Sequence, residues 1–267
     1  MSQSDRPALS PTALESALLV LGAYFLATAG CGWAAALPLS DTGLWLLRGL
    51  LPPLVLAAGA CWVIRRHRPP VTVLRPRPGL IGFLFSALLL GAGGGIWAGA
   101  TSIDLLAAGL PQGARLPWAL GWVGLLVPII EETYFRGVLQ AAVMRFVGGQ
   151  RPDGACSPES RGPRAWLAVV AAIGVPAVVF ALAHLGSPQT PVLLLMGLGL
   201  GVLQYWSGSL VVPILGHMAW NLATVSYGLH PGMGDLAMPL ALPGAMWLSM
   251  SLLVHYRSVM GLGRATP

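Results

Sequence analysis

Long apolar segments without charged side chains follow one another through most of the sequence. Only 9% of the 267 residues are charged and 55% are hydrophobic, whereas about 25% of the residues of a typical soluble domain are charged. A helix needs roughly 20 apolar residues to cross the hydrocarbon core of a bilayer, and most of these segments are about that long or longer. The chain is therefore predicted to be a membrane protein that crosses a bilayer several times.

Eight apolar segments, separated by Arg, Pro or Gly clusters, are candidate spans. We expect an all-α, polytopic helical bundle of about eight transmembrane helices, which forms a single integral membrane domain over residues 1–267. The third segment contains Gly91-Ala92-Gly93-Gly94-Gly95, a run suited to close helix packing or to a bend. The predicted spans are Ala17 to Leu37, Leu44 to Ile64, Gly79 to Leu110, Leu116 to Met144, Ala165 to His184, Pro191 to Trp206, Leu210 to Leu229 and Leu236 to Tyr256.

The positions of the arginines predict how the bundle is oriented. The net charge is +6 and every basic residue is Arg, and such residues favour the cytoplasmic side of short loops. We take this balance as a topology signal and not as a sign of nucleic-acid binding. Both termini are predicted to be cytoplasmic, in a multi-pass protein of the bacterial inner membrane. The arginines lie mainly in two loops, which contain Arg65, Arg66, Arg68, Arg75 and Arg77, and Arg145, Arg151, Arg161 and Arg164.

Three charged residues stand inside the fourth predicted span, in the stretch IIEETYFRG. Glu132 and Arg136 are four residues apart, so that they can form an ion pair on one face of a helix. Glu131 is turned by about 100° from Glu132 and remains available to another partner. Ionisable side chains within a span are costly and mark functional sites by default. We therefore expect one structural carboxylate and one that takes part in chemistry.

Three further polar residues lie in or at the end of later spans. His184 ends the fifth predicted span, and we expect Pro176 to break that span and bring His184 to the depth of the other residues. His217 and Asn221 are four residues apart in the seventh span and share one helix face. Each of these residues alone is more often structural than catalytic. Together with Glu131 they form a set of chemically active side chains in a chain with few other intramembrane polar groups.

These motifs, in this order, resemble the signature of the CAAX protease and bacteriocin-processing family of intramembrane endopeptidases. The resemblance covers a motif-bearing core of about residues 116–229. It implies that Glu131 and His184 activate a water molecule, that His217 and Asn221 stabilise the oxyanion, and that the Glu132 and Arg136 ion pair supports the site. The expected partners are a membrane-associated protein or peptide substrate and the lipid bilayer. Bacterial members that trim leader peptides or sorting tails, as myxosortases do, are the expected analogues.

Other functions remain open at the level of the sequence. No cofactor is expected, but zinc is possible, with Glu131, His184 and His217 as ligands. The sequence has no HExxH motif, and Asn is a poor zinc ligand, which favours the metal-free mechanism. A transporter or channel would more often show paired, interrupted spans in two halves. A non-catalytic membrane scaffold or immunity-type protein would not need Glu131, His184, His217 and Asn221 together.

Overall fold

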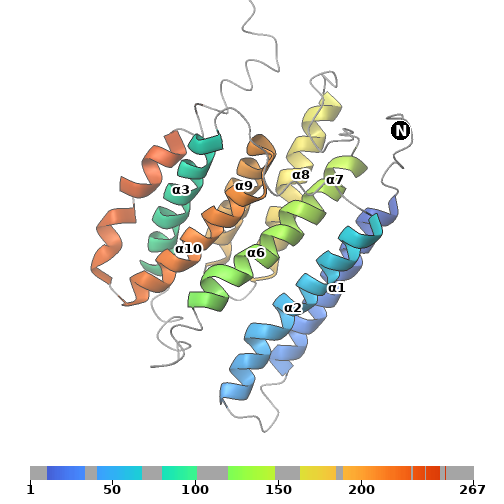
Figure 1. Ribbon diagram of the computed structural model, residues 1–267, viewed down its shortest axis with the longest axis horizontal. Coiled ribbons are helices and arrows are strands. Elements are labelled where there is room, and N and C mark those ends of the chain that lie inside the picture. Colours follow the sequence, from blue (N-terminus) through green and yellow to red (C-terminus); the bar gives the residue numbers. More distant parts are fainter. Residues whose placement is uncertain are drawn as a thin grey trace, which may run out of the picture.

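The computed structural model describes residues 11–33, 41–67, 80–100, 120–147, 163–184, 189–229, 231–237, 239–246 and 250. Within these ranges every element is helical and no strand occurs. The long helices lie side by side and run between the same two ends of the molecule (Figure 1). The predicted all-α bundle is confirmed.

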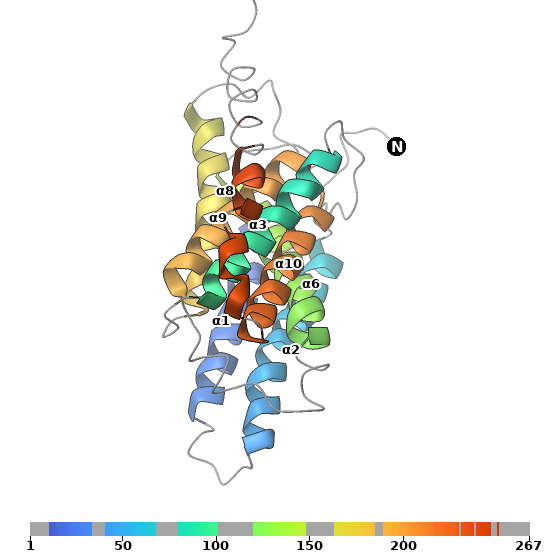
Figure 2. The same ribbon diagram turned by 90° about the vertical axis from the view of Figure 1, so that its left-hand side faces the viewer.

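The first two helices form an antiparallel hairpin. Helix α1 covers Pro11–Trp33 and α2 covers Asp41–His67. At one end, Ser16 Oγ lies 2.9 Å from Nε2 of His67. At the other end, Nε of Arg48 donates to the carbonyl oxygen of Cys31 at 3.2 Å, which satisfies one of the carbonyl groups left unpaired in the last turns of α1. Figure 2 shows that this hairpin projects beyond the other helices.

Glycine packing joins α3, Leu80–Ala100, to α10, Val211–Leu229. A Cβ atom at Gly91 would collide with the carbonyl oxygen of Gly216, and one at Gly95 would collide with that of Trp220. The two backbones can approach closely only because both α3 positions lack a side chain. The predicted use of this glycine run for close packing is confirmed.

The segment with the three charged residues is one continuous helix, here called the rod, in which π-helical and α-helical turns alternate. It consists of η3 (Leu120–Leu126), α6 (Val127–Glu132), η4 (Thr133–Leu139) and α7 (Gln140–Phe146), where η3 and η4 are π-helical. The rod lies between the α1–α2 hairpin and the remaining helices (Figure 1). Its middle is therefore buried on all sides.

Helices α8, Pro163–Leu182, and α9, Thr190–Ser207, pack as a second antiparallel pair. Gly197 of α9 lies against Ala177 of α8, where an added Cβ would be 3.1 Å from the Cα of Ala177. Helix α9 ends at Gly208, which has φ 61° in the left-handed region that favours glycine. The short 3-10 helix η5, Pro231–Leu236, follows α10.

Four helical segments are long and apolar enough to cross a membrane, judged by length and composition: Ala13–Cys31, Leu47–His67, Leu80–Gly99 and Thr190–Ser207. The apolar part of α8, Trp166–Leu182, is shorter. These segments support a membrane protein, while the total of about eight spans and the cytoplasmic termini stay predictions. Much of the last predicted span lies outside the described residues. Helices α2 and α7 end where α1 and α8 begin (Figure 1), so that both arginine-rich loops start from the same end of the bundle.

Candidate active site

The two adjacent glutamates lie at the junction of α6 and η4, between two π-helical segments. The backbone N–H of Thr133 donates to the carbonyl oxygens of Ile129 and Ile130, and that of Gln140 donates to Phe135, five residues earlier. π-helical turns are rare and often occur at functional sites. The wider turns change the directions in which the side chains between them leave the rod.

Glu132 and Arg136 form the predicted ion pair in a fully buried position. Oε2 of Glu132 lies 3.2 Å from Nε of Arg136, and both side chains are 0% exposed. Nη2 of Arg136 also donates to the carbonyl oxygen of Gly197 on α9 at 3.1 Å. The guanidinium group therefore connects the rod to α9. That the pair supports the site remains a prediction.

His217 lies between the two carboxylates. Its Nδ1 is 2.9 Å from Oε1 of Glu132, and its Nε2 is 3.7 Å from Oε2 of Glu131. Glu132 thus binds Arg136 with one oxygen and His217 with the other. The sequence analysis did not foresee the second contact, because it joins residues 85 positions apart. The pairing of each ring nitrogen with a different carboxylate fixes the orientation of the imidazole.

His184 lies in the turn directly after α8 and is half-buried. Its Nδ1 is 2.9 Å from the carbonyl oxygen of Phe180, and its own carbonyl oxygen accepts a bond from Thr190 Oγ1 at 2.8 Å. The expected break at Pro176 was wrong, since α8 continues from Pro163 to Leu182. Membrane helices tolerate proline where neighbouring helices hold the backbone, and here Ala177 packs against α9.

The ring of Phe180 connects the parts of the site. It contacts His184, with centroids 4.8 Å apart, and His217, with centroids 5.7 Å apart. The guanidinium carbon of Arg136 lies 5.6 Å from the centre of the same ring. Phe180 is part of the sequence motif that ends at His184. Only the packing of the helices shows that its ring contacts both imidazoles.

Asn221 lies one turn after His217 on α10, as predicted. Its Nδ2 donates to the carbonyl oxygen of Val123 in η3 at 2.8 Å. An amide group carries two N–H donors, so that the second N–H remains for another acceptor. The contact also connects α10 to the π-helical turn that precedes Glu131.

The predicted charged and imidazole side chains interact electrostatically with one carboxylate, that of Glu131. Glu131 is 5% exposed and interacts most strongly with His217, then with His184, Glu132 and Arg136. Within the part of the chain that the structure describes, Glu131 and His184 make no direct contact. The structure therefore brings five of the predicted side chains into one cluster, in which His217 is the immediate neighbour of Glu131, whereas Asn221 contacts Val123.

The segment that contains this cluster matches the model of a known protein family. Residues 113–223 match the family model described as type II CAAX prenyl endopeptidase Rce1-like. Through this segment the chain is similar to the Rce1-like family. The matched residues are less than half of the chain, and they include Glu131, His184, His217 and Asn221. No curated protein and no solved structure matches the chain significantly.

The match of this segment agrees with the predicted class of enzyme, because the matched family is one of CAAX prenyl endopeptidases and these are proteases. The likeness to myxosortases stays a prediction. The match also leaves α1, α2 and α3 outside its range. One residue of that outer part still reaches the cluster, since the buried phenol of Tyr24 on α1 interacts electrostatically with Glu131.

The contacts of the two histidine rings bear on the zinc alternative. Among the described residues, no group of three or more His, Cys, Asp or Glu side chains could hold a metal ion. Nδ1 of His217 is engaged by Glu132, and Nδ1 of His184 by Phe180. Both contacts leave the Nε2 atom of the ring for other partners, and the zinc alternative with Glu131, His184 and His217 as ligands stays a prediction.

Proposed function

We propose that this protein is an intramembrane endopeptidase that hydrolyses a peptide bond of a membrane-associated protein or peptide with water activated by side chains. The observation that carries the proposal is the placement of His217 between Glu131 and Glu132 in a buried, arginine-supported cluster. A cluster of two carboxylates, two imidazoles and an amide contains the groups that acid–base hydrolysis needs.

Glu131 is the proposed general base. Oε2 of Glu131 lies 3.7 Å from His217 and thus beyond hydrogen-bond distance, whereas both oxygens of Glu132 have close partners. Glu131 takes a proton from water, the resulting hydroxide forms a bond to the scissile carbonyl carbon, and the C–N bond breaks as the amine nitrogen receives a proton. His184, with its Nε2 not engaged by the Phe180 carbonyl, assists Glu131 in orienting that water.

His217 and Asn221 are the proposed oxyanion donors. Glu131, Glu132 and Arg136 together have a formal charge of −1 when both carboxylates are ionised, and a proton on His217 would balance this charge. An imidazolium held by Glu132 through Nδ1 presents its Nε2–H toward Glu131 and toward an oxygen that arrives there. Donors in a buried site of this kind stabilise developing negative charge strongly because little water competes with them.

The substrate class follows from the setting of the site. A cluster enclosed by helices of a membrane protein is reached by a peptide that is itself associated with the membrane. The chain contains Arg but no Lys and is rich in Ala, Gly and Pro, which is typical of a high-GC bacterial genome, where prenylated substrates are not expected. Leader peptides or sorting tails of membrane-associated proteins are therefore the proposed targets.

Two measurements test this proposal. The membrane-associated peptides of cells with and without the protein are compared, and a peptide found only when the protein is present defines the substrate. The purified protein in detergent is then assayed on that peptide, with Glu131, His184, His217 and Asn221 replaced one at a time. Full cleavage by all four variants would refute the proposal and favour a non-catalytic role in the membrane.

A further inference from the structure

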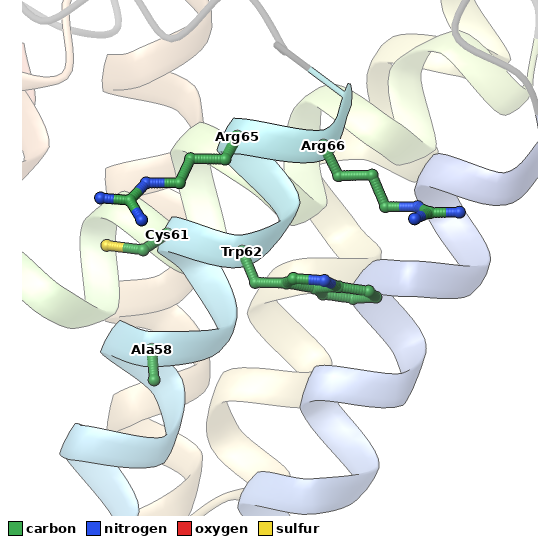
Figure 3. A pocket seen from close by; sticks show the side chains of 5 residues that line it. All are labelled: Ala58, Cys61, Trp62, Arg65 and Arg66. Carbon is green, nitrogen blue, oxygen red and sulfur yellow. The ribbon is translucent and has the colours of Figure 1, made fainter.

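A groove on the outer face of α2 lies away from the catalytic cluster. It has a volume of about 590 Å³ and is lined by residues of this one helix: Ala58, Cys61, Trp62, Arg65 and Arg66. Figure 3 shows Arg65 and Cys61 along one side and Arg66 and Trp62 along the other, with Ala58 below them. The spacing of three, four, seven and eight residues places all five on one stripe of the helix. The small side chain of Ala58 leaves the lower part of the stripe open.

The upper end of this groove has a strong positive charge. Arg65 and Arg66 are exposed, and neither forms an ion pair with another residue that the structure describes. The sequence contains no Asp or Glu between Asp41 and Asp104. The two guanidinium groups therefore have no carboxylate nearby in the sequence, and an occupant with negative charge would complement them.

The groove also crosses from apolar to polar surroundings along α2. Residues Leu47–His67 form a candidate membrane span, and the two arginines stand in its last turns. Trp62 is 44% exposed, and exposed tryptophans are enriched where a helix meets the headgroup layer. An occupant must therefore have an anionic part beside the arginines and an apolar part beside Trp62 and Ala58.

We infer that this groove binds one anionic phospholipid, with its phosphate at the end of the groove that carries Arg65 and Arg66 and an acyl chain over Ala58 between Cys61 and Trp62. Guanidinium groups pair with phosphate oxygens in bidentate fashion and bind them more specifically than a point charge does. Juxtamembrane arginines already attract anionic lipids of the cytoplasmic leaflet. The groove also accommodates one acyl chain, so that a lipid is bound at a defined site and not only attracted by charge. The inference does not depend on the proposed protease mechanism.

The test is native mass spectrometry of the full-length protein in detergent with added phosphatidylglycerol or phosphatidylcholine of the same acyl chains. We expect the unmodified protein to retain one phosphatidylglycerol in preference to phosphatidylcholine. The double variant Arg65→Gln/Arg66→Gln should lose this preference. Arg75→Gln/Arg77→Gln, which removes the same charge from the following loop, should keep it. Equal losses in the two double variants would overturn the inference and leave only general charge attraction.

The shape of the groove is tested separately from its charge. Ala58→Leu fills the chain-binding part without changing the charge and should weaken retention of phosphatidylglycerol at least several-fold, whereas Ala23→Leu at an exposed position of α1 should not. Inorganic phosphate alone should not displace the lipid. Displacement by phosphate, or normal retention by Ala58→Leu, would overturn the acyl-chain part of the site.

Cys61 provides a second readout in the groove. It is a free, exposed thiol, whereas Cys31 is buried. In a Cys156→Ser background, added phosphatidylglycerol should slow alkylation of Cys61 by a maleimide, and phosphatidylcholine should slow it less. Equal alkylation rates with both lipids would contradict specific occupancy of the groove. Protection of Cys61 by a second copy of the chain bound over the same residues would also contradict it.

Discussion

Nδ1 of His217 lies 2.9 Å from Oε1 of Glu132, while the second oxygen of that carboxylate lies 3.2 Å from Nε of Arg136. A single buried glutamate therefore joins the imidazole on α10 to the guanidinium group that is bound to α9. This relationship makes Glu132 a positioning residue for His217 as well as an ion-pair partner. Glu131 has a longer contact, 3.7 Å from its Oε2 to Nε2 of the same His217.

Replacing the proposed general base should stop hydrolysis without loss of the fold. Glu131→Gln keeps the size of the side chain and removes its basicity, so that cleavage should fall by about 100- to 10,000-fold. Substrate binding should survive. Single-turnover cleavage of the identified peptide, together with a binding measurement, checks both parts. An active Glu131→Gln enzyme would exclude Glu131 as the base.

Chelation distinguishes the metal-free mechanism from the zinc alternative. With no metal required, a strong chelator should leave the cleavage rate of metal-analysed protein unchanged. If zinc is bound by Glu131, His184 and His217, chelation should inactivate the enzyme and added metal should restore it. Stoichiometric zinc whose removal abolishes cleavage would contradict the mechanism proposed here.

Removing the oxyanion donors should act on turnover more than on binding. His217→Ala and Asn221→Ala should each lower the cleavage rate by about 100- to 1000-fold, because such donors act mainly in the transition state. Steady-state kinetics separate the two effects, with kcat falling and KM nearly constant. Ser226→Ala, on the same helix, is the control and should retain activity. A rise in KM alone would indicate that the two residues bind the substrate instead.

Loss of the buried guanidinium group should destabilise the protein. Arg136→Ala leaves Glu132 without its cation and should cost about 3 to 5 kcal/mol, as expected for breaking a buried pair. Thermal or denaturant unfolding in detergent measures the loss. Arg145→Ala, at a less buried position two turns later, is the matched control and should have a much smaller effect. A stable but inactive Arg136→Ala enzyme would instead point to a direct role of Arg136 in catalysis.

A side chain at one of the two tightest contacts between α3 and α10 should displace α10. Gly95→Leu would collide with the backbone of Trp220 and should cost about 1 to 3 kcal/mol or more, in the range of overpacked cores. Activity should fall as well, because α10 carries His217 and Asn221. Gly22→Leu is the control, since a Cβ there meets nothing within 4 Å. Equal stability of the two variants would contradict the close packing.

The orientation in the membrane can be tested with fused reporters. A reporter placed after Pro70 or after Gly154 should behave as cytoplasmic, because these loops contain five and four arginines. The two reporters should also agree with each other, since both loops begin at the same end of the bundle (Figure 1). A reporter found outside the cell in either position would overturn the predicted topology.

Much of the fold class could be predicted because it depends on local properties of the chain. The apolar runs around Leu56 and Leu84 have the length and composition of membrane helices, and the bounds of α2, α9 and α10 are within a few residues of those predicted. The glycine run of α3 also indicated a close contact. These features can be recognised without knowing which helices pack together, because hydrophobicity and helix length are properties of a single segment.

Candidate site residues could likewise be proposed from the sequence. Glu131, Glu132, Arg136, His184, His217 and Asn221 stand out because charged and imidazole side chains are costly in apolar surroundings. The spacing of four residues also predicted the pairing of Glu132 with Arg136 and the common face of His217 and Asn221. Each of these relations is confined to one helix.

The relations between helices were decided only by the tertiary structure. The contact of His217 with Glu132, the position of Phe180 between two imidazoles and the reach of Tyr24 toward Glu131 all join distant segments. The continuity of α8 through Pro176 also depends on α9, which packs beside it. The sequence determined which side chains are too costly to be buried without partners, and the packing of the helices determined which partners they have, because such pairings depend on distances between helices that no single segment encodes.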